Sequence, residues 1–200
     1  MFSPVGQELE RGWPGRIEGD TVVQLAAQTL QSFFTGGSSA REHAEFPLAD
    51  VLLRAPVLEP PAVRLYEDAT RFSFANPTAI RSPGALIPRP YGQLDVAMRL
   101  VAVIGLDGSI GGWTGLAEWR APGLALPKDR DFALVLGPIV DTELADAFDW
   151  EAARALAELN TRLRPGDLLA GPVLVLHEDV ASGPLELELD GVGTLGAIVA

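Results

Sequence analysis

Glycine and proline interrupt this chain along most of its length, and they constrain its fold more than any other feature. The 200 residues include 21 Gly and 16 Pro. Both residue types favour turns and weaken the interior of helices and central strands. From about Val63 onward, the apolar residues fall into short β-type runs between these turns. The pattern therefore predicts a mainly β chain with few helices, and the sequence contains no internal repeat.

Two segments have the pattern of β-hairpins. Residues 15–25 read as two short strands joined by an Asp-containing turn at 18–20. Near the C-terminal end, residues 185–189 alternate strictly between Leu and Glu, which predicts a strand with one buried and one exposed face. The Asp-Gly pair at 190–191 supplies a hairpin turn into a second strand at 194–199.

Two further segments are expected to form helices. Residues 26–34 place apolar side chains at helical spacing, and Gly36 and Gly37 provide an exit from the helix. The second helix is expected from Trp150 to Leu163, where Asp149 can cap the first turn and Pro165-Gly166 ends the segment.

Composition excludes several classes of function. A hydrophobic content of 48% is enough for one sizeable core, or for a main domain with a small appendage. Only 15 basic residues stand against 27 acidic ones, giving a net charge of −12, which argues against nucleic acid as a partner. The sequence has no Cys, so disulfides and thiolate chemistry are excluded. No apolar run approaches the roughly 20 residues of a membrane span, so we expect a soluble, cytoplasmic protein without a membrane partner.

A Pro-containing connector at residues 55–61 suggests how the chain is divided. We predict a small N-terminal α+β module at 1–58 and a larger β domain at 59–200. The whole chain is then of the α+β class, mainly β.

The run from Gln93 to Gly105 is the most informative β-type segment, and its surroundings resemble a known family. Several motifs stand in the order and approximate spacing of the fumarylacetoacetate hydrolase superfamily. They are Pro77-Thr78-Ala79-Ile80, Asp107-Gly108, Gly112-Trp113-Thr114, residues 131–138 and Leu163-Arg164-Pro165-Gly166-Asp167. The resemblance implies a mixed β-sandwich roll that is usually dimeric. It also implies a small-molecule ligand, because members bind Mg²⁺ or Mn²⁺ and act on β-dicarbonyl or 2-oxo acids.

The positions that hold the metal in that family have changed in this sequence. The resemblance places Ala97 and Arg99 where members have a Glu-x-Glu pair, and it places Glu118 at the third carboxylate. A hard divalent cation needs several oxygen ligands, and a guanidinium beside it repels it. We therefore expect no metal and no other cofactor. A weakly bound ion between Asp95 and Glu118 is the alternative, since Asp95 lies two residues from Ala97 on the same strand face.

If the fold is kept, Arg99 and Glu118 face each other where the metal would sit. Under the catalytic hypothesis, Arg99 and Arg120 stabilise developing oxyanion charge and Glu118 moves a proton. The alternative is that Arg99 and Glu118 form only a salt bridge that fills an inactive site.

Four more residues are candidates for contacting the substrate. Arg130 stands where the family has a Lys, and Lys128 lies beside it in the sequence. Glu67 falls in the segment that carries an acid/base pair in the family. The alternative is that Glu67 and its neighbour Asp68 belong to a solvated loop, which is the more common role of adjacent carboxylates. Trp119 is either a stacking platform for the ligand or part of the core.

Two classes of function remain open after the sequence. The first is a metal-independent enzyme acting on a β-dicarbonyl or 2-oxo compound as an isomerase, dehydratase, decarboxylase, cyclase or C–C hydrolase. The second is a non-catalytic relative that binds a ligand or a protein partner. A homodimer is expected in both cases by family analogy.

Overall fold

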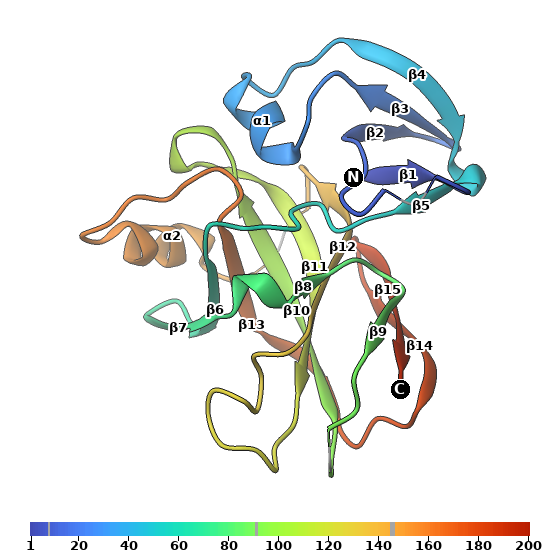
Figure 1. The fold of residues 1–200 in the computed structure, drawn as a ribbon. Helices are drawn as coiled ribbons and strands as arrows, with labels where there is room; N and C mark the ends of the chain where they lie inside the picture. The colour runs from blue at the N-terminus through green and yellow to red at the C-terminus, as the bar shows by residue number, and fades with distance from the viewer. Residues whose placement is uncertain (8, 91, 145–146) are drawn as a thin grey trace.

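Strands make up most of the chain, as the sequence predicted (Figure 1). The structure, a computed structural model, describes residues 1–7, 9–90, 92–144 and 147–200. Its strands are β1 (Phe2–Pro4), β2 (Gly15–Glu18), β3 (Thr21–Leu25), β4 (Glu42–Pro47), β5 (Val51–Leu53), β6 (Val63–Asp68), β7 (Arg71–Ala75), β8 (Ile80–Arg81), β9 (Ala85–Ile87), β10 (Asp95–Ile104), β11 (Ile110–Arg120), β12 (Leu134–Asp141), β13 (Leu168–His177), β14 (Gly183–Leu189) and β15 (Gly193–Val199). The α-helices are α1 (Leu30–Thr35) and α2 (Trp150–Glu158), and short 3-10 turns cover Leu48–Asp50, Pro77–Ala79 and Leu106–Gly108.

A seven-stranded sheet forms the centre of the molecule. Its strand order is β7-β6-β13-β10-β11-β12-β8, mostly antiparallel, with parallel pairs between β13 and β6 and between β12 and β8. A three-stranded sheet of order β14-β15-β9 lies beside it, and two small sheets, β1-β5 and β2-β3-β4, are built from the N-terminal part. This mixed, mainly β architecture is the fold class that the sequence predicted.

β10 is buried along its whole length, which explains why its sequence is a nearly continuous apolar run. Its even-numbered residues, such as Met98 and Leu100, join one core cluster with the β9-β15-β14 sheet and α2. Val101 and Val103 point to the opposite face and join a second cluster. Each such side chain contributes roughly 1.5–3 kcal/mol by leaving water. Because β10 is buried on both faces, it is a rigid scaffold for a site.

Both hairpins expected from the sequence are present. β2 pairs with β3 across the turn at Glu18 to Thr21. β14 pairs with β15 in one unbroken register from Gly183–Val199 to Leu189–Gly193. Leu187 and Leu189 are buried, and Glu186 and Glu188 are exposed.

The two helices are shorter than expected. α1 begins only after Thr29, whose side chain accepts a hydrogen bond from the Ser32 amide in a capping box. α2 is capped by Asp149 as predicted, but it ends at Glu158 rather than Leu163. Asn160 adopts a left-handed conformation with φ +59°, which stops the helix before the Pro165-Gly166 pair.

The N-terminal sheets share no strand pairing with the seven-stranded sheet, but residues of the N-terminal part pack into the same hydrophobic core. Phe34 of α1 and the connector residues Ala55 and Val57 belong to the same core cluster as Val101. A division into units at residues 1–58 and 59–200 therefore stays a prediction.

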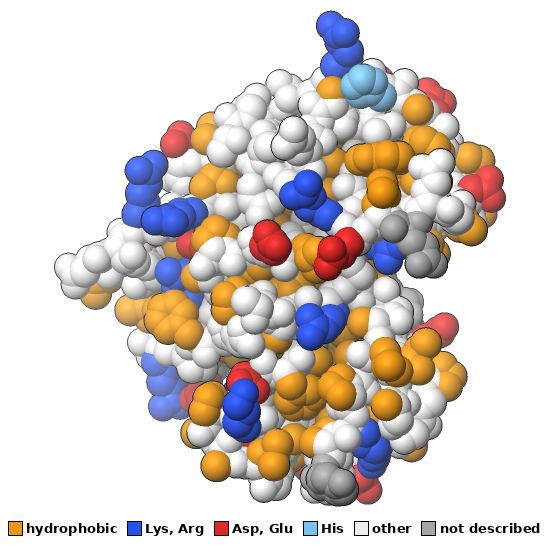
Figure 2. Space-filling model, viewed as in Figure 1, with side chains coloured by type: hydrophobic (Ala, Val, Ile, Leu, Met, Phe, Trp, Pro, Cys, Tyr) orange, Lys and Arg blue, Asp and Glu red, His pale blue; other side chains and the backbone are white. Residues whose placement is uncertain are grey.

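On the face shown in Figure 2, basic side chains lie scattered among acidic and hydrophobic ones, without a continuous basic area. No helix in the described part of the chain has the length and apolar character needed to cross a membrane.

Candidate functional site

The register between β10 and β11 gathers five chemically important positions on one face of the sheet. Asp95 lies opposite Arg120, Ala97 opposite Glu118, and Arg99 opposite Leu116. Directly paired residues point to the same side, and alternate residues of a strand share that side. Asp95, Arg99, Glu118 and Arg120 thus project from the same face, next to the small side chain of Ala97.

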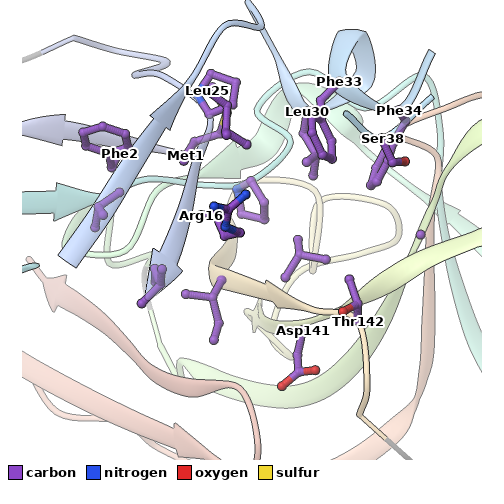
Figure 3. A pocket seen from close by; sticks show the side chains of 18 of the residues that line it. Met1, Phe2, Arg16, Leu25, Leu30, Phe33, Phe34, Ser38, Asp141 and Thr142 are labelled. Atoms are coloured by element: carbon purple, nitrogen blue, oxygen red, sulfur yellow. The ribbon is translucent and has the colours of Figure 1, made fainter. Parts of the chain in front are cut away.

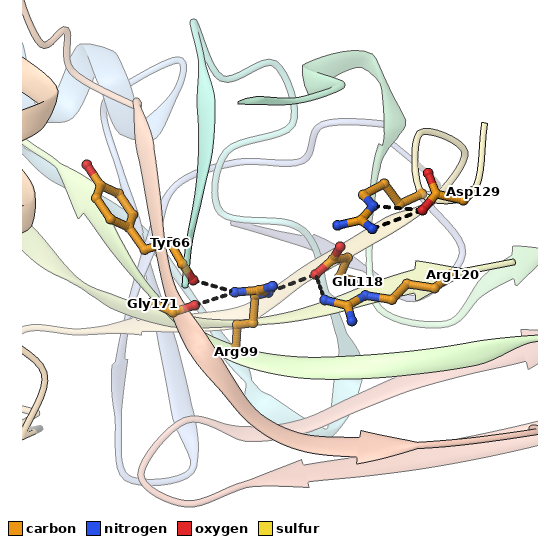
Figure 4. Close-up of polar contacts among 7 residues, drawn as sticks. Tyr66, Arg99, Glu118, Arg120, Asp129 and Gly171 are labelled. Atoms are coloured by element: carbon orange, nitrogen blue, oxygen red, sulfur yellow. Dashed lines mark hydrogen bonds and ion pairs between the residues drawn. The ribbon is translucent and has the colours of Figure 1, made fainter. Parts of the chain in front are cut away.

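Arg99 forms a close ion pair with Glu118, as the sequence led us to expect (Figure 4). Its Nε donates to Glu118 Oε2 at 2.7 Å, and only 4% of Arg99 is exposed. Its Nη1 donates to the carbonyl oxygens of Tyr66 at 2.9 Å and Gly171 at 2.7 Å.

These two carbonyls lie where β6 and β13 separate. The last residues paired between the two strands are Leu65 and Ala170, one position before Tyr66 and Gly171. The guanidinium of Arg99 therefore bridges the opening between β6 and β13. It donates hydrogen bonds to two carbonyl groups that lie just beyond the last residues paired between these strands. This bridge gives Arg99 a structural task besides pairing with Glu118.

Glu118 lies between two guanidinium groups and is completely buried. Its Oε2 also accepts a hydrogen bond from Arg120 Nη2 at 2.8 Å. Its second oxygen, Oε1, and the Nε of Arg120 are buried without a hydrogen-bond partner in the described part of the protein. Buried polar atoms nearly always have a partner, so these two atoms need an explanation, such as a bound water or a ligand group.

The protonation states follow from burial and from these contacts. Burial by itself raises the pKa of Glu118, but the hydrogen bond from Arg120 and the charge of Arg99 outweigh it and bring that pKa below its ordinary value. Burial lowers the pKa of Arg99, and the charge of Glu118 partly offsets this effect. Glu118 is therefore a carboxylate at neutral pH, and a weak base.

A second ion pair lies beside the first. Arg130 Nη2 lies 2.9 Å from Asp129 Oδ2, and this hydrogen-bonded pairing raises the pKa of Arg130. The charges of Glu118 and Glu67 raise it further, which places both carboxylates near Arg130. Asp129 Oδ1 is another buried atom without a partner among the described residues. We call Arg99, Glu118, Arg120, Asp129 and Arg130 the Glu118 cluster.

The donor set of the Glu118 cluster does not fit Mg²⁺ or Mn²⁺. Ala97 offers no ligand, Arg99 is a cation, and one oxygen of Glu118 is already shared by two guanidiniums. A hard cation needs several oxygen ligands free of competing positive charge. Within residues 1–7, 9–90, 92–144 and 147–200, no group of three or more His, Asp or Glu side chains is arranged to hold a metal.

Asp95 already accepts hydrogen bonds from other groups, which argues against a weakly bound ion between Asp95 and Glu118. Its Oδ1 accepts hydrogen bonds from Gln93 Nε2 at 2.8 Å and from the Asp179 amide at 2.9 Å. Asp95 thus fastens the turn after β13, and its neighbour in the ladder is the cation Arg120.

The remaining sequence candidates lie in different places. Glu67 is exposed on the β6-β7 hairpin and pairs with Arg71. This is the solvated position that we considered as the alternative to a role in substrate binding. Lys128 is exposed and pairs with Asp131 at 2.7 Å. Trp119 is fully buried on the opposite face from Glu118, in the core cluster with Met98, so it cannot stack on a ligand held by Glu118.

A cavity of about 770 Å³ lies away from the Glu118 cluster, between the N-terminal part and the end of β12 (Figure 3). Its wall is largely apolar and includes Phe33, Phe34 and Leu30, and none of the residues of the Glu118 cluster. Arg16 lines it too, but Glu18 and Glu42 already bind that guanidinium. Size alone thus points to this cavity, whereas unpartnered charged groups point to the Glu118 cluster. We take the cluster as the candidate site because chemistry requires such groups.

Sequence reasoning missed three participants. The carbonyls of Tyr66 and Gly171 have no side-chain signature, so no sequence motif could reveal them. Asp129 could have been found, since it stands between Lys128 and Arg130 in a segment already singled out.

Comparison with known proteins identifies the fold. No protein-family model matches the sequence, and no curated protein matches it. Among solved structures, the maleylpyruvate hydrolase from Sphingobium sp. SYK-6 matches with a TM-score of 0.74 and 20% sequence identity, over 95% of this chain and 96% of that one. That hydrolase has also been solved in complex with manganese(II) and pyruvate.

An isomerase gives a similar match. The 5-carboxymethyl-2-hydroxymuconate delta-isomerase from Mycobacterium smegmatis has a TM-score of 0.71 and 18% identity, over 94% of each chain. These structures are of the fumarylacetoacetate hydrolase superfamily. The fold that the sequence resemblance implied is confirmed.

Proposed function

We propose, from the premise that this chain has the fold of the fumarylacetoacetate hydrolase superfamily, that its Glu118 cluster binds a 2-oxo or β-dicarbonyl acid without a metal. The chain then acts on that compound as an isomerase, dehydratase, decarboxylase, cyclase or C–C hydrolase. The similar structures include a hydrolase and isomerases by name, and this proposal carries their general reaction type over to this chain.

One observation carries the proposal: buried Glu118 faces more cations than it can balance. Arg99 and the partly exposed Arg120 share its Oε2, Arg130 lies nearby, and among the described residues Glu118 Oε1 and Arg120 Nε have no hydrogen-bond partner. A carboxylate or enolate oxygen of a ligand would accept from Arg120, and an enol hydroxyl would donate to Glu118. Guanidinium groups bind carboxylates through charge-assisted hydrogen bonds and stabilise negative charge that develops during a reaction.

The residues take different roles under this proposal. Arg120 and Arg130 are the groups that meet the ligand, because their side chains are 22% and 36% exposed. Arg99 is a positioning residue, since its Nε and Nη1 already hold Glu118 and two backbone carbonyls. Glu118 accepts the proton from an acidic enol or carbon acid.

The complete burial of Glu118 and its lowered pKa favour a second candidate. A general base works best when its pKa lies near the working pH, and Glu118 lies well below that. In this second function the same cluster binds the acid, or a protein partner, and no turnover follows. A homodimer and a cytoplasmic location belong to both candidates as predictions, and light scattering tests the first of them.

Titration calorimetry with chelator-treated protein tests metal-independent binding. We expect oxalate and pyruvate to bind with the same affinity before and after Mg²⁺ or Mn²⁺ is added, and elemental analysis to find no stoichiometric metal. The Arg120→Ala variant should bind about tenfold more weakly, or worse, because it loses a charge-assisted hydrogen bond. Arg71→Ala, an exposed arginine outside the cluster, is the matched control and should bind normally.

Failure to bind either acid, or binding that requires the metal, would overturn the proposal. Turnover then separates the two candidates. Decarboxylation or enol–keto exchange of oxaloacetate, followed by ultraviolet absorbance and lost in Arg120→Ala, supports the enzyme. Binding without any turnover of 2-oxo and β-dicarbonyl acids supports the non-catalytic protein.

A further inference from the structure

Two apolar side chains of β13 stand on the same sheet face as the Glu118 cluster. Leu176 is paired with Ala97, which is itself paired with Glu118 in the next strand. Val173 is paired with Arg99. Paired residues share a face, and a register shift between Met98 and Arg99 allows Val173 and Leu176, three residues apart, to lie on the same one. Both therefore flank the cluster on its β13 side.

Both side chains are open to solvent. Leu176 is 45% exposed and Val173 is 38% exposed, whereas every residue of the neighbouring β10 is buried. The cause is the separation of β6 from β13, whose pairing ends at Leu65 and Ala170. Beyond that point, β13 has β10 on one side and no other paired strand within the described residues.

The wall that β13 presents here contains no charged group. From Pro172 to Leu176 every side chain is apolar, and His177 falls opposite Val96, on the other face. A dicarboxylic ligand whose second carboxylate lay against this wall would find no charged or hydrogen-bonding side chain from Pro172 to Leu176 to pair with. An apolar substituent in the same place would instead be stabilised by leaving water.

We infer that the ligand of the Glu118 cluster is a monocarboxylic 2-oxo or β-dicarbonyl acid with an alkyl, alkenyl or aryl substituent, which packs on Leu176 and Val173. This inference rests on the proposed function and narrows its substrate class. The acid head meets Arg120 and Arg130, and the substituent runs along β13. The two ends of the ligand thus meet surfaces of opposite character.

A chain-length series tests the inference. Calorimetry would compare pyruvate, 2-oxobutanoate, 2-oxohexanoate and 2-oxooctanoate with the dicarboxylate 2-oxoglutarate. We expect affinity to rise about threefold to fourfold for each CH₂ that becomes buried, and 2-oxoglutarate to bind no better than pyruvate. Equal affinity along the series, or preference for 2-oxoglutarate, would overturn the inference while leaving the proposed function standing. Absence of all binding would instead remove the proposed function.

Two variants give the series its control. Leu176→Asp should bring the affinity for 2-oxooctanoate down to that for pyruvate. Val175→Asp changes a neighbour that is 44% exposed but paired with Met98, on the other face, and should keep the chain-length dependence. Thermal unfolding checks that both variants are folded.

Light scattering on the same proteins examines a competing role for these side chains. A wild-type dimer that becomes a monomer in Leu176→Asp would assign Leu176 to an interface between copies and overturn the inference. An unchanged mass, together with the lost chain-length dependence, supports it.

Discussion

Among the described residues, two arginine–carboxylate pairs have both side chains buried, and they differ in what surrounds them. Arg64 Nη1 lies 3.3 Å from Asp167 Oδ2, with side chains 6% and 3% exposed. Arg99 Nε lies 2.7 Å from Glu118 Oε2, with side chains 5% and 0% exposed. Burial and distance alone would assign both pairs the same role.

Their charge balance separates them. Arg64 faces the rings of Phe72 and Phe74 at 5.7 and 5.4 Å, and Asp167 Oδ2 also accepts the Arg164 amide of the turn before β13. That pair is one cation with one anion, enclosed by strands and aromatic rings. Glu118 instead has two guanidiniums on one oxygen, and Arg130 nearby.

Each pair leaves buried polar atoms without partners in the described part of the chain, including Arg64 Nε and Asp167 Oδ1. Unpartnered atoms by themselves therefore do not distinguish a ligand site. The partly exposed Arg120 and the excess of cations beside Glu118 do. A balanced enclosed pair is structural, and an unbalanced pair at a solvent-facing arginine is suited to an anion.

The largest effect is expected for Arg99→Met. The variant leaves Glu118 buried with one cation fewer and frees the carbonyls of Tyr66 and Gly171, so unfolding free energy should fall by about 3–5 kcal/mol. Urea denaturation measures it. Arg99→Met combined with Glu118→Leu should recover part of the loss, because the buried carboxylate is then removed. The rest remains, since Arg120 loses its partner and the carbonyls of Tyr66 and Gly171 lose the Arg99 donor. A loss below about 1 kcal/mol in the single variant would mean that water reaches the cluster freely.

A smaller loss is expected for Asp167→Asn. The amide can still accept from Arg164, but Arg64 loses its charge-assisted partner, so unfolding free energy should fall by about 2 kcal/mol. Oxalate affinity, measured by calorimetry, should stay that of the wild type. If Asp167→Asn weakens oxalate binding as much as Arg120→Ala does, the two pairs are not functionally distinct.

Acid should weaken the Glu118 pair in a defined direction. Its pKa is lower in the folded protein than its ordinary value, so its stabilising contribution is present above the unfolded pKa of about 4.3. That contribution is lost as pH falls through the lower folded pKa. The difference in melting temperature between the wild type and Glu118→Gln should thus be constant from about pH 7 to pH 5 and shrink below about pH 4. A difference that grows toward low pH would contradict the lowered pKa.

The smallest effect is expected for the exposed pairs of Arg71 with Glu67 and Asp68. Their side chains are 69%, 67% and 53% exposed, and water screens such contacts. Arg71→Ala should change unfolding free energy by less than about 0.5 kcal/mol in urea. A loss comparable to that of Asp167→Asn would show that the β6-β7 hairpin is coupled to the Glu118 cluster.

Sequence patterns gave the hairpins and the site strand, and they failed where a distant contact decided the outcome. The Leu-Glu alternation at 185–189 and the turn at 190–191 predict β14 and β15 because such signals are local. The end of α2 was placed too late, because the left-handed Asn160 stops the helix before Pro165 does. The resemblance to the fumarylacetoacetate hydrolase superfamily led us to expect that the side chains of Arg99 and Glu118 face each other. Trp119 was kept both as a stacking platform and as a core residue, although it is adjacent to Glu118 in one strand, and alternation places such neighbours on opposite faces.

The sequence by itself determined a mainly β chain and the placement of Ala97 and Arg99 two residues apart on one strand face, since turn residues, alternation and side-chain charge are properties of the chain alone. Only the tertiary structure decided what Arg99 holds, because the carbonyls of Tyr66 and Gly171 meet it from strands 33 and 72 positions away along the chain. It also decided that Leu176 and Val173 border the cluster, because the register of β13 on β10 and the divergence of β6 are set by packing across the whole sheet.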